Sequence, residues 1–97
     1  MSAAAWRQVG LPPVAPRVQF EAVDPETGIR LVISGADGRW YGTAYGKLAG
    51  FPVTVWISED ATPDVCSSRE LMQAFLVQSA AELTAAGMTR EYDAARP

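Results

Sequence analysis

Residues 39–58, RWYGTAYGKLAGFPVTVWIS, constrain the fold of this chain more than any other stretch. Successive side chains of a β-strand point to opposite faces, so residues of equal parity share a face. In the second half of this stretch, one parity is wholly apolar: Phe51, Val53, Val55 and Ile57. The segment therefore predicts two strands joined by a glycine-bounded turn, with these apolar side chains facing the core.

The opposite face of this hairpin carries aromatic rings interleaved with hydroxyls and two cations. Its members are Arg39, Tyr41, Thr43, Tyr45 and Lys47 on the first strand, and Thr54 and Trp56 on the second. Tyr, Trp and Arg are enriched at the hot spots of protein interfaces. Thr, Tyr and Trp are also good strand formers. The pattern fits either a binding face or an ordinary solvated face.

Glycine recurs every fourth residue through the hairpin, at positions 38, 42, 46 and 50. In a strand this spacing keeps all of them on one face, and glycine there lets a neighbouring element approach closely. We expect Gly42 and Gly46 to make room for a helix or for the ring of Trp40.

Two further strands precede the hairpin, at residues 18–23 and 29–34, because apolar and polar side chains alternate in both. Residues 24–28, DPETG, and 35–38, GADG, have the composition of turns. The regular spacing of the turns predicts a four-stranded antiparallel meander, in which Arg30 and Val32 share the outer face with the hairpin aromatics. Pro52 indicates that the last strand lies at an edge.

A helix is predicted at 68–86, with Ser67 as N-cap and Glu70 at N3 of a capping box. Apolar and small residues recur at helical spacing along one stripe, at 72, 75, 76, 79, 80, 83 and 86. Gly87 is expected to end the helix, with Met88 contacting Leu83 as in a Schellman motif.

These elements predict an α+β fold: a four-stranded antiparallel meander with one long C-terminal helix on its inner face. Residues 1–16 are expected to form a Pro-rich leader, either flexible or partly helical, with Trp6 and Val9 on one side of a short helix that Gly10 ends. Residues 17–88 form the single domain, and 89–97 a loose tail. One helix is narrower than four strands. Either the leader, through Trp6 and Leu11, or a second copy must therefore cover the rest of the inner face.

The sequence is poor in catalytic groups. It contains no His, which removes the commonest general base and metal ligand. Cys66 precedes the helix without a partner base, and a buried structural thiol is the simpler interpretation. The carboxylates Glu59, Asp60 and Asp64 do not have EF-hand spacing, and a helix N-terminus favours them in any case. We expect no enzyme, no metal and no cofactor.

Composition bears on the kind of partner and on the location of the protein. The net charge is −3, which weighs against a general nucleic-acid binder. A single cysteine suits a reducing compartment, and no secretory signal or membrane-spanning run is present, so a cytoplasmic protein is expected.

Two functional hypotheses remain. The first is a non-catalytic protein-interaction module, such as a small inhibitor, antagonist or adaptor of bacterial or phage type, with a homodimer as a further expectation. The second is a platform for single-stranded nucleic acid that uses the same face. The candidate binding residues are Arg30, Arg39, Tyr41, Tyr45, Lys47 and Trp56.

Overall fold

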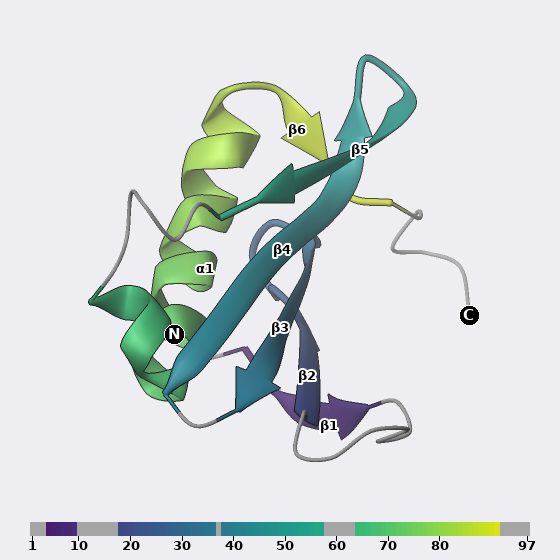
Figure 1. Cartoon of the computed structure of the whole chain (residues 1–97). Helices are drawn as coiled ribbons and strands as arrows, with labels where there is room; N and C mark the ends of the chain where they lie inside the picture. Colours follow the sequence, from purple (N-terminus) through teal and green to yellow (C-terminus); the bar gives the residue numbers. More distant parts are fainter. Residues whose placement is uncertain (1–3, 10–17, 37, 58–63, 92–97) are drawn as a thin grey trace.

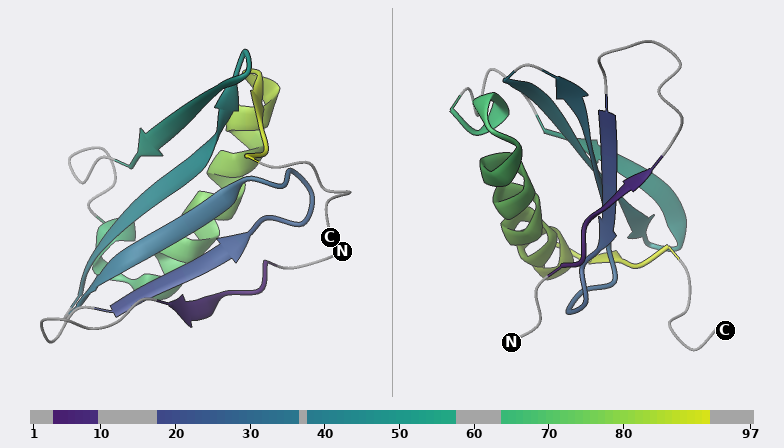
Figure 2. Two further views of the ribbon diagram at one scale, coloured as in Figure 1. Left: turned by 90° about the vertical axis from the view of Figure 1, so that its right-hand side faces the viewer. Right: turned by 90° about the horizontal axis from the view of Figure 1, so that it is seen from below.

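The structure, a computed structural model, describes residues 4–9, 18–36, 38–57 and 64–91. One antiparallel sheet packs against one helix, so the described chain has two layers (Figures 1 and 2). The strands are β1 (Arg7–Val9), β2 (Val18–Val23), β3 (Arg30–Ala36), β4 (Arg39–Leu48), β5 (Phe51–Trp56) and β6 (Met88–Thr89). A 3₁₀ turn, η1 (Val65–Ser67), precedes the helix α1 (Arg69–Ala85).

The order of strands is β1-β2-β3-β4-β5, and β6 pairs with β4 beyond the start of β3. The predicted meander is therefore confirmed as β2 to β5, with β5 at an edge. The predicted count of four strands is wrong, since β1 and β6 join the same sheet. These two strands contain three and two residues, which is too short for an alternating pattern to be recognised.

The leader, which was expected to be flexible or partly helical, contributes a strand. Arg7–Val9 pair with β2, with Arg7 opposite Glu21. The ring of Trp6 packs against the buried core, as the covering arm in the sequence analysis required. Leu11, the second residue of that arm, lies outside the described residues. The sheet edge at β2 supplies backbone partners that a sequence pattern cannot reveal.

The start of the expected C-terminal tail also belongs to the folded unit. Thr89 pairs with Lys47 in the ladder of β4, and the side chain of Met88 is buried. A Cβ added at Gly46 would lie 2.5 Å from the carbonyl oxygen of Thr89 and 2.6 Å from Cε of Met88. Glycine at position 46 therefore makes room for β6 and not for the helix.

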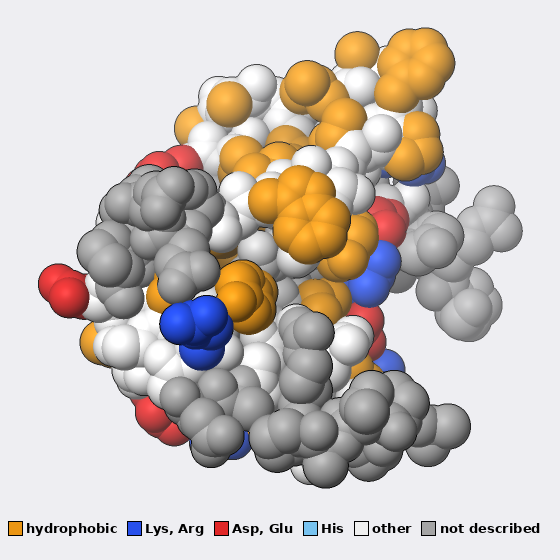
Figure 3. Space-filling view, in the orientation of Figure 1, with side chains coloured by type: hydrophobic (Ala, Val, Ile, Leu, Met, Phe, Trp, Pro, Cys, Tyr) orange, Lys and Arg blue, Asp and Glu red, His pale blue; other side chains and the backbone are white. Residues whose placement is uncertain are grey.

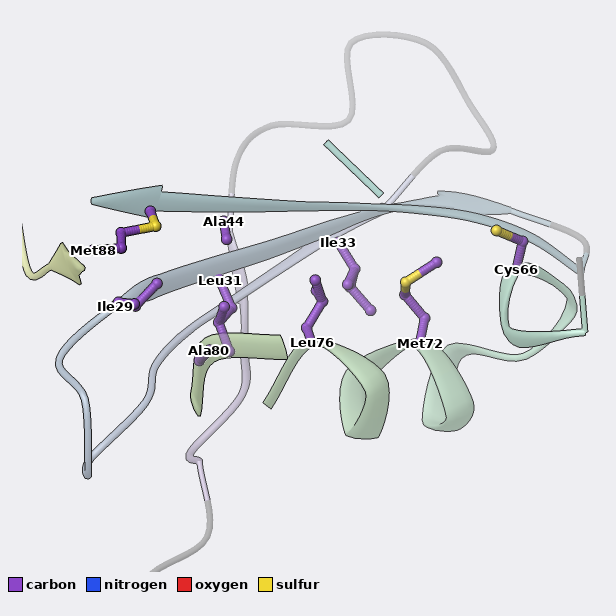
Figure 4. Close-up of a cluster of buried hydrophobic side chains, with 9 residues drawn as sticks. All are labelled: Ile29, Leu31, Ile33, Ala44, Cys66, Met72, Leu76, Ala80 and Met88. Carbon is purple, nitrogen blue, oxygen red and sulfur yellow. The ribbon is translucent and has the colours of Figure 1, made fainter. Parts of the chain in front are cut away.

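The core lies between the inner face of β3–β4 and one stripe of α1. Met72, Leu76 and Ala80 point from the helix toward the sheet residues that Figure 4 labels, with Cys66 and Met88 at the two ends. A Cβ added at Gly42 would lie 2.8 Å from Sδ of Met72 and 3.1 Å from Cδ2 of Leu76. The expectation that Gly42 admits the helix is confirmed.

The helix begins one residue later than predicted. Ser68 is the N-cap and its hydroxyl accepts a hydrogen bond from the Leu71 N–H at 3.3 Å. Ser67 closes the preceding 3₁₀ turn, and its hydroxyl donates to the carbonyl oxygen of Asp64. The 3₁₀ turn includes Ser67, the predicted N-cap, and moves the start of the helix to the next serine. At the other end Gly87, with a φ of 108°, follows the C-cap as predicted.

Two leucines of α1 give a direct test of this packing. Leu76 is fully buried, whereas Leu71 is 52% exposed. Leu76→Ala leaves a cavity and is expected to lower the free energy of unfolding by about 2–5 kcal/mol. Leu71→Ala is expected to change it by less than about 0.5 kcal/mol, measured by urea denaturation. Equal losses for the two variants would mean that the helix does not pack on the sheet by this stripe.

Candidate interaction surface

The strand register gathers the predicted aromatic residues on the face of the sheet opposite α1. Trp56 lies opposite Thr43, and Tyr45 lies opposite Thr54. Tyr41 and Tyr45 flank Thr43 at two residues on either side, so both rings are diagonal neighbours of Trp56. These three rings are here called the aromatic band. The left view of Figure 2 looks onto this outer face, with α1 behind the sheet.

The aromatic band is exposed while the residues beneath it are not. Trp56 is 72% exposed and Tyr41 37%, but Thr43 and Val32, which face each other across β3 and β4, are buried. A buried threonine and valine on the solvent side of a sheet require cover from longer neighbours. Thr43 and Val32 therefore form a buried floor between the rings of the band. In Figure 3 orange side chains gather over β4, β5 and the turn between them.

Arg30 holds the chain beyond β6 against the outer face. Its Nε donates to Oε1 of Glu91 at 2.7 Å and its Nη2 to Oε2 at 3.2 Å, while Nη1 donates to Oε1 of Glu21 at 3.1 Å. Its guanidinium also lies over the ring of Tyr45, with Cζ 4.1 Å from the centroid. The hydrogen bonds that Arg30 donates to Glu91 and, less strongly, to Glu21 raise the pKa of Arg30 above its usual value, against the opposing effect of burial. We call these four side chains the Arg30 clamp.

The clamp changes the role that Arg30 can take in binding. Two carboxylates already occupy its guanidinium, so it orients Tyr45 and does not present an open cation. Glu21 and Glu91 were not among the sequence candidates. Glu91 lies 61 residues from Arg30 in the chain, and no periodic pattern connects residues so far apart.

The other two predicted cations stand at the two ends of β4. Arg39 is exposed at its start, and Lys47 is half-buried near its end, opposite Pro52. Within the described residues neither forms an ion pair. The aromatic band thus lies between two positive charges. Arg7, at the β1 edge, adds a third cation on this face, paired with Glu21 at 3.2 Å.

The remaining candidates from the sequence are Cys66 and the carboxylates that precede the helix. Cys66 is buried in η1 as part of the core cluster. Glu59 and Asp60 lie outside the described residues, and no group of three His, Cys, Asp or Glu side chains suited to a metal occurs within them. In the part of the chain that the structure covers, α1 is neither long nor apolar enough to cross a membrane.

The comparisons with protein-family models, with curated proteins and with solved structures found no match to this chain.

The clamp predicts a measurable contribution to stability. Glu91→Gln removes the charge of the side chain but keeps its shape, and is expected to lower the free energy of unfolding by about 1 kcal/mol. This value lies between the typical contribution of an exposed ion pair and that of a hydrogen bond to a charged group. Glu82→Gln is the matched control on the exposed side of α1, expected to change it by less than about 0.5 kcal/mol. Chemical denaturation compares the two. The clamp would contribute nothing if both variants unfolded at the wild-type denaturant concentration.

Proposed function

We propose that this protein is a non-catalytic interaction module that binds another protein through the aromatic band of its outer face. The single observation that carries the proposal is the exposure of Trp56, 72%, on an edge strand beside Tyr41 and Tyr45. Trp and Tyr bring large contact areas and few rotatable bonds, so little conformational entropy is lost when a partner covers them.

The support of the band adds to this argument. Tyr45 is held by the Arg30 clamp, and Thr43 and Val32 form a buried floor. A surface whose rings are fixed before binding loses less freedom on association than a mobile surface. Arg39 and Lys47 at the two ends favour a partner that presents acidic groups around an apolar centre.

The test uses a variant and a charge-matched control. Tyr41→Asp/Tyr45→Asp replaces two rings of the band with carboxylates. Leu71→Asp/Gln78→Asp adds the same charge at two exposed positions of α1. Wild type and both variants, confirmed as folded by circular dichroism, are immobilised and exposed to lysate of the source cell. Retained proteins are identified by mass spectrometry.

We expect a protein retained by the wild type and by the control to be lost from the band variant. With that protein purified, the band variant is expected to bind more weakly by about 2 kcal/mol or more, roughly thirtyfold in Kd. A partner that binds all three proteins equally would exclude the aromatic band as its site.

A single-stranded nucleic acid is the second candidate, favoured by the position of the band between Arg39 and Lys47. Bases stack on exposed aromatic rings, and cations follow the phosphates. The net charge of −3 and the carboxylates Glu21 and Glu91 on the same face oppose it.

Fluorescence decides between these candidates, because Trp56 is the most exposed aromatic ring of the band. Stacking of a base on its indole would quench its emission. We expect no quenching by oligothymidylate or oligouridylate at low salt. Saturable quenching that weakens as the salt concentration rises, and that Trp56→Leu abolishes, would show that the band binds a nucleic acid and would contradict the proposed protein partner.

A further inference from the structure

The free edge of β5 is unusually open for an edge strand. Among the described strands β5 pairs only with β4, while its side chains Val53 and Val55 pack inward against the core. The strand FPVTVW carries no charged side chain, although sheet edges are commonly protected by Lys or other charges. Phe51 and Trp56 are each 72% exposed. Only proline at position 52 limits what can pair there.

The hydrogen-bonding direction of each β5 residue follows from the turn and the register. Ala49 and Gly50 both have positive φ, 52° and 86°, and form a two-residue turn between the facing residues Leu48 and Phe51. The N–H of Ile57 donates to the carbonyl oxygen of Gly42 at 3.0 Å. Hydrogen-bonded pairs alternate along an antiparallel ladder, so the odd-numbered residues 51–57 face β4.

The backbone groups of Pro52, Thr54 and Trp56 consequently point to the open edge. Proline lacks an N–H, so position 52 offers only an acceptor. Thr54 and Trp56 offer both groups. Any strand that pairs with β5 must be centred near Thr54.

We propose that the partner of this edge is β5 of a second copy, antiparallel, with the two-fold axis between the two Thr54 residues. The sequence around Thr54 is nearly symmetric in chemistry. Reading outward, the axis pairs Val53 with Val55, Pro52 with Trp56 and Phe51 with Ile57 of the second copy. Every apolar side chain of the strand thereby meets an apolar side chain.

This register also fits the backbone. The two Thr54 residues exchange both of their hydrogen bonds, and each Trp56 N–H donates to the Pro52 carbonyl of the other copy. Pro52 thus lies opposite Trp56 of the second copy, and it only has to accept a hydrogen bond there. The Trp56 carbonyl stays open to water. Shifting the axis to Val53 would place Pro52 opposite Thr54 and leave the Thr54 carbonyl without its donor.

The dimer has one consequence for the outer face. Because the two-fold axis between antiparallel strands runs perpendicular to the sheet, both helices lie on one side of the joined sheet and the two aromatic bands come together on the other. The inference stands on the edge of β5 and does not depend on the proposed function. Its tests change Thr54 and leave Tyr41 and Tyr45 intact, so failure of the dimer and failure of partner binding are distinguishable.

Cross-linking tests the register directly. In a hydrogen-bonded antiparallel pair the two Cα atoms are about 5.5 Å apart, within the range of a disulfide. Thr54→Cys is expected to form a covalent dimer on mild oxidation at least about tenfold faster than Gln8→Cys, since pairing raises the effective thiol concentration. Gln8 is exposed on β1, the opposite edge, and the native Cys66 is buried. Equal rates for the two variants would overturn the proposal.

Sedimentation equilibrium tests the association without a cross-link. The wild-type mass is expected to rise with concentration from 10.4 kDa toward twice that value. Thr54→Pro removes only an outward N–H, so it is expected to retain the β4 ladder and remain monomeric, whereas Thr54→Val is expected to dimerise like the wild type. A wild type that stays at 10.4 kDa at millimolar concentration would refute the dimer, whether or not Thr54→Pro folds.

Discussion

The close approach of α1 to β4 at Gly42 determines where the helix lies on the sheet and which strands it leaves uncovered. A side chain at position 42 would overlap the atoms of Met72 and Leu76 that fill the core. Because glycine lets the helix sit directly over β3 and β4, the core is narrow. Trp6 covers it on the β1 side, and β5 projects beyond the helix on the other. The open strand and its exposed tryptophan are thus a consequence of where the helix rests.

Much of the fold can be read from local patterns. Strand β2 has the predicted bounds, since its alternation is uninterrupted and turn residues follow it. Parity also places Val53, Val55 and Ile57 against the core as predicted, whereas Phe51, expected on the same core face, lies beside the turn and is 72% exposed. The N-cap was displaced by one residue, where Ser67 and Ser68 are equally suitable by composition and only the 3₁₀ turn distinguishes them. Strands β1 and β6 were not predicted, because each forms by pairing with a strand that is distant in the sequence.

The candidate site divides in the same way. Parity placed Tyr41, Tyr45 and Trp56 on one surface, but it treated Arg30 as an open cation. The three-dimensional structure pairs Arg30 with Glu21 and Glu91 and sets it over Tyr45. A cation that has no partner nearby in the sequence can thus be neutralised by an ion pair with a distant residue. The same contact ties the chain after β6 to the sheet and leaves Arg39 and Lys47 as the charges that a partner meets.

The alternation of backbone direction along β5 also bears on how this strand moves. Its amides at Val53, Val55 and Ile57 face β4, while those of Thr54 and Trp56 face outward. Among the described strands only β4 pairs with β5, so the tip of the hairpin, where Phe51 is exposed, can open at a lower free energy than global unfolding requires. Neighbouring amides within one strand then differ in their exchange with water. The amides that face β4 are protected by the fold itself, whereas those of Thr54 and Trp56 are protected only by whatever comes to lie beside the strand.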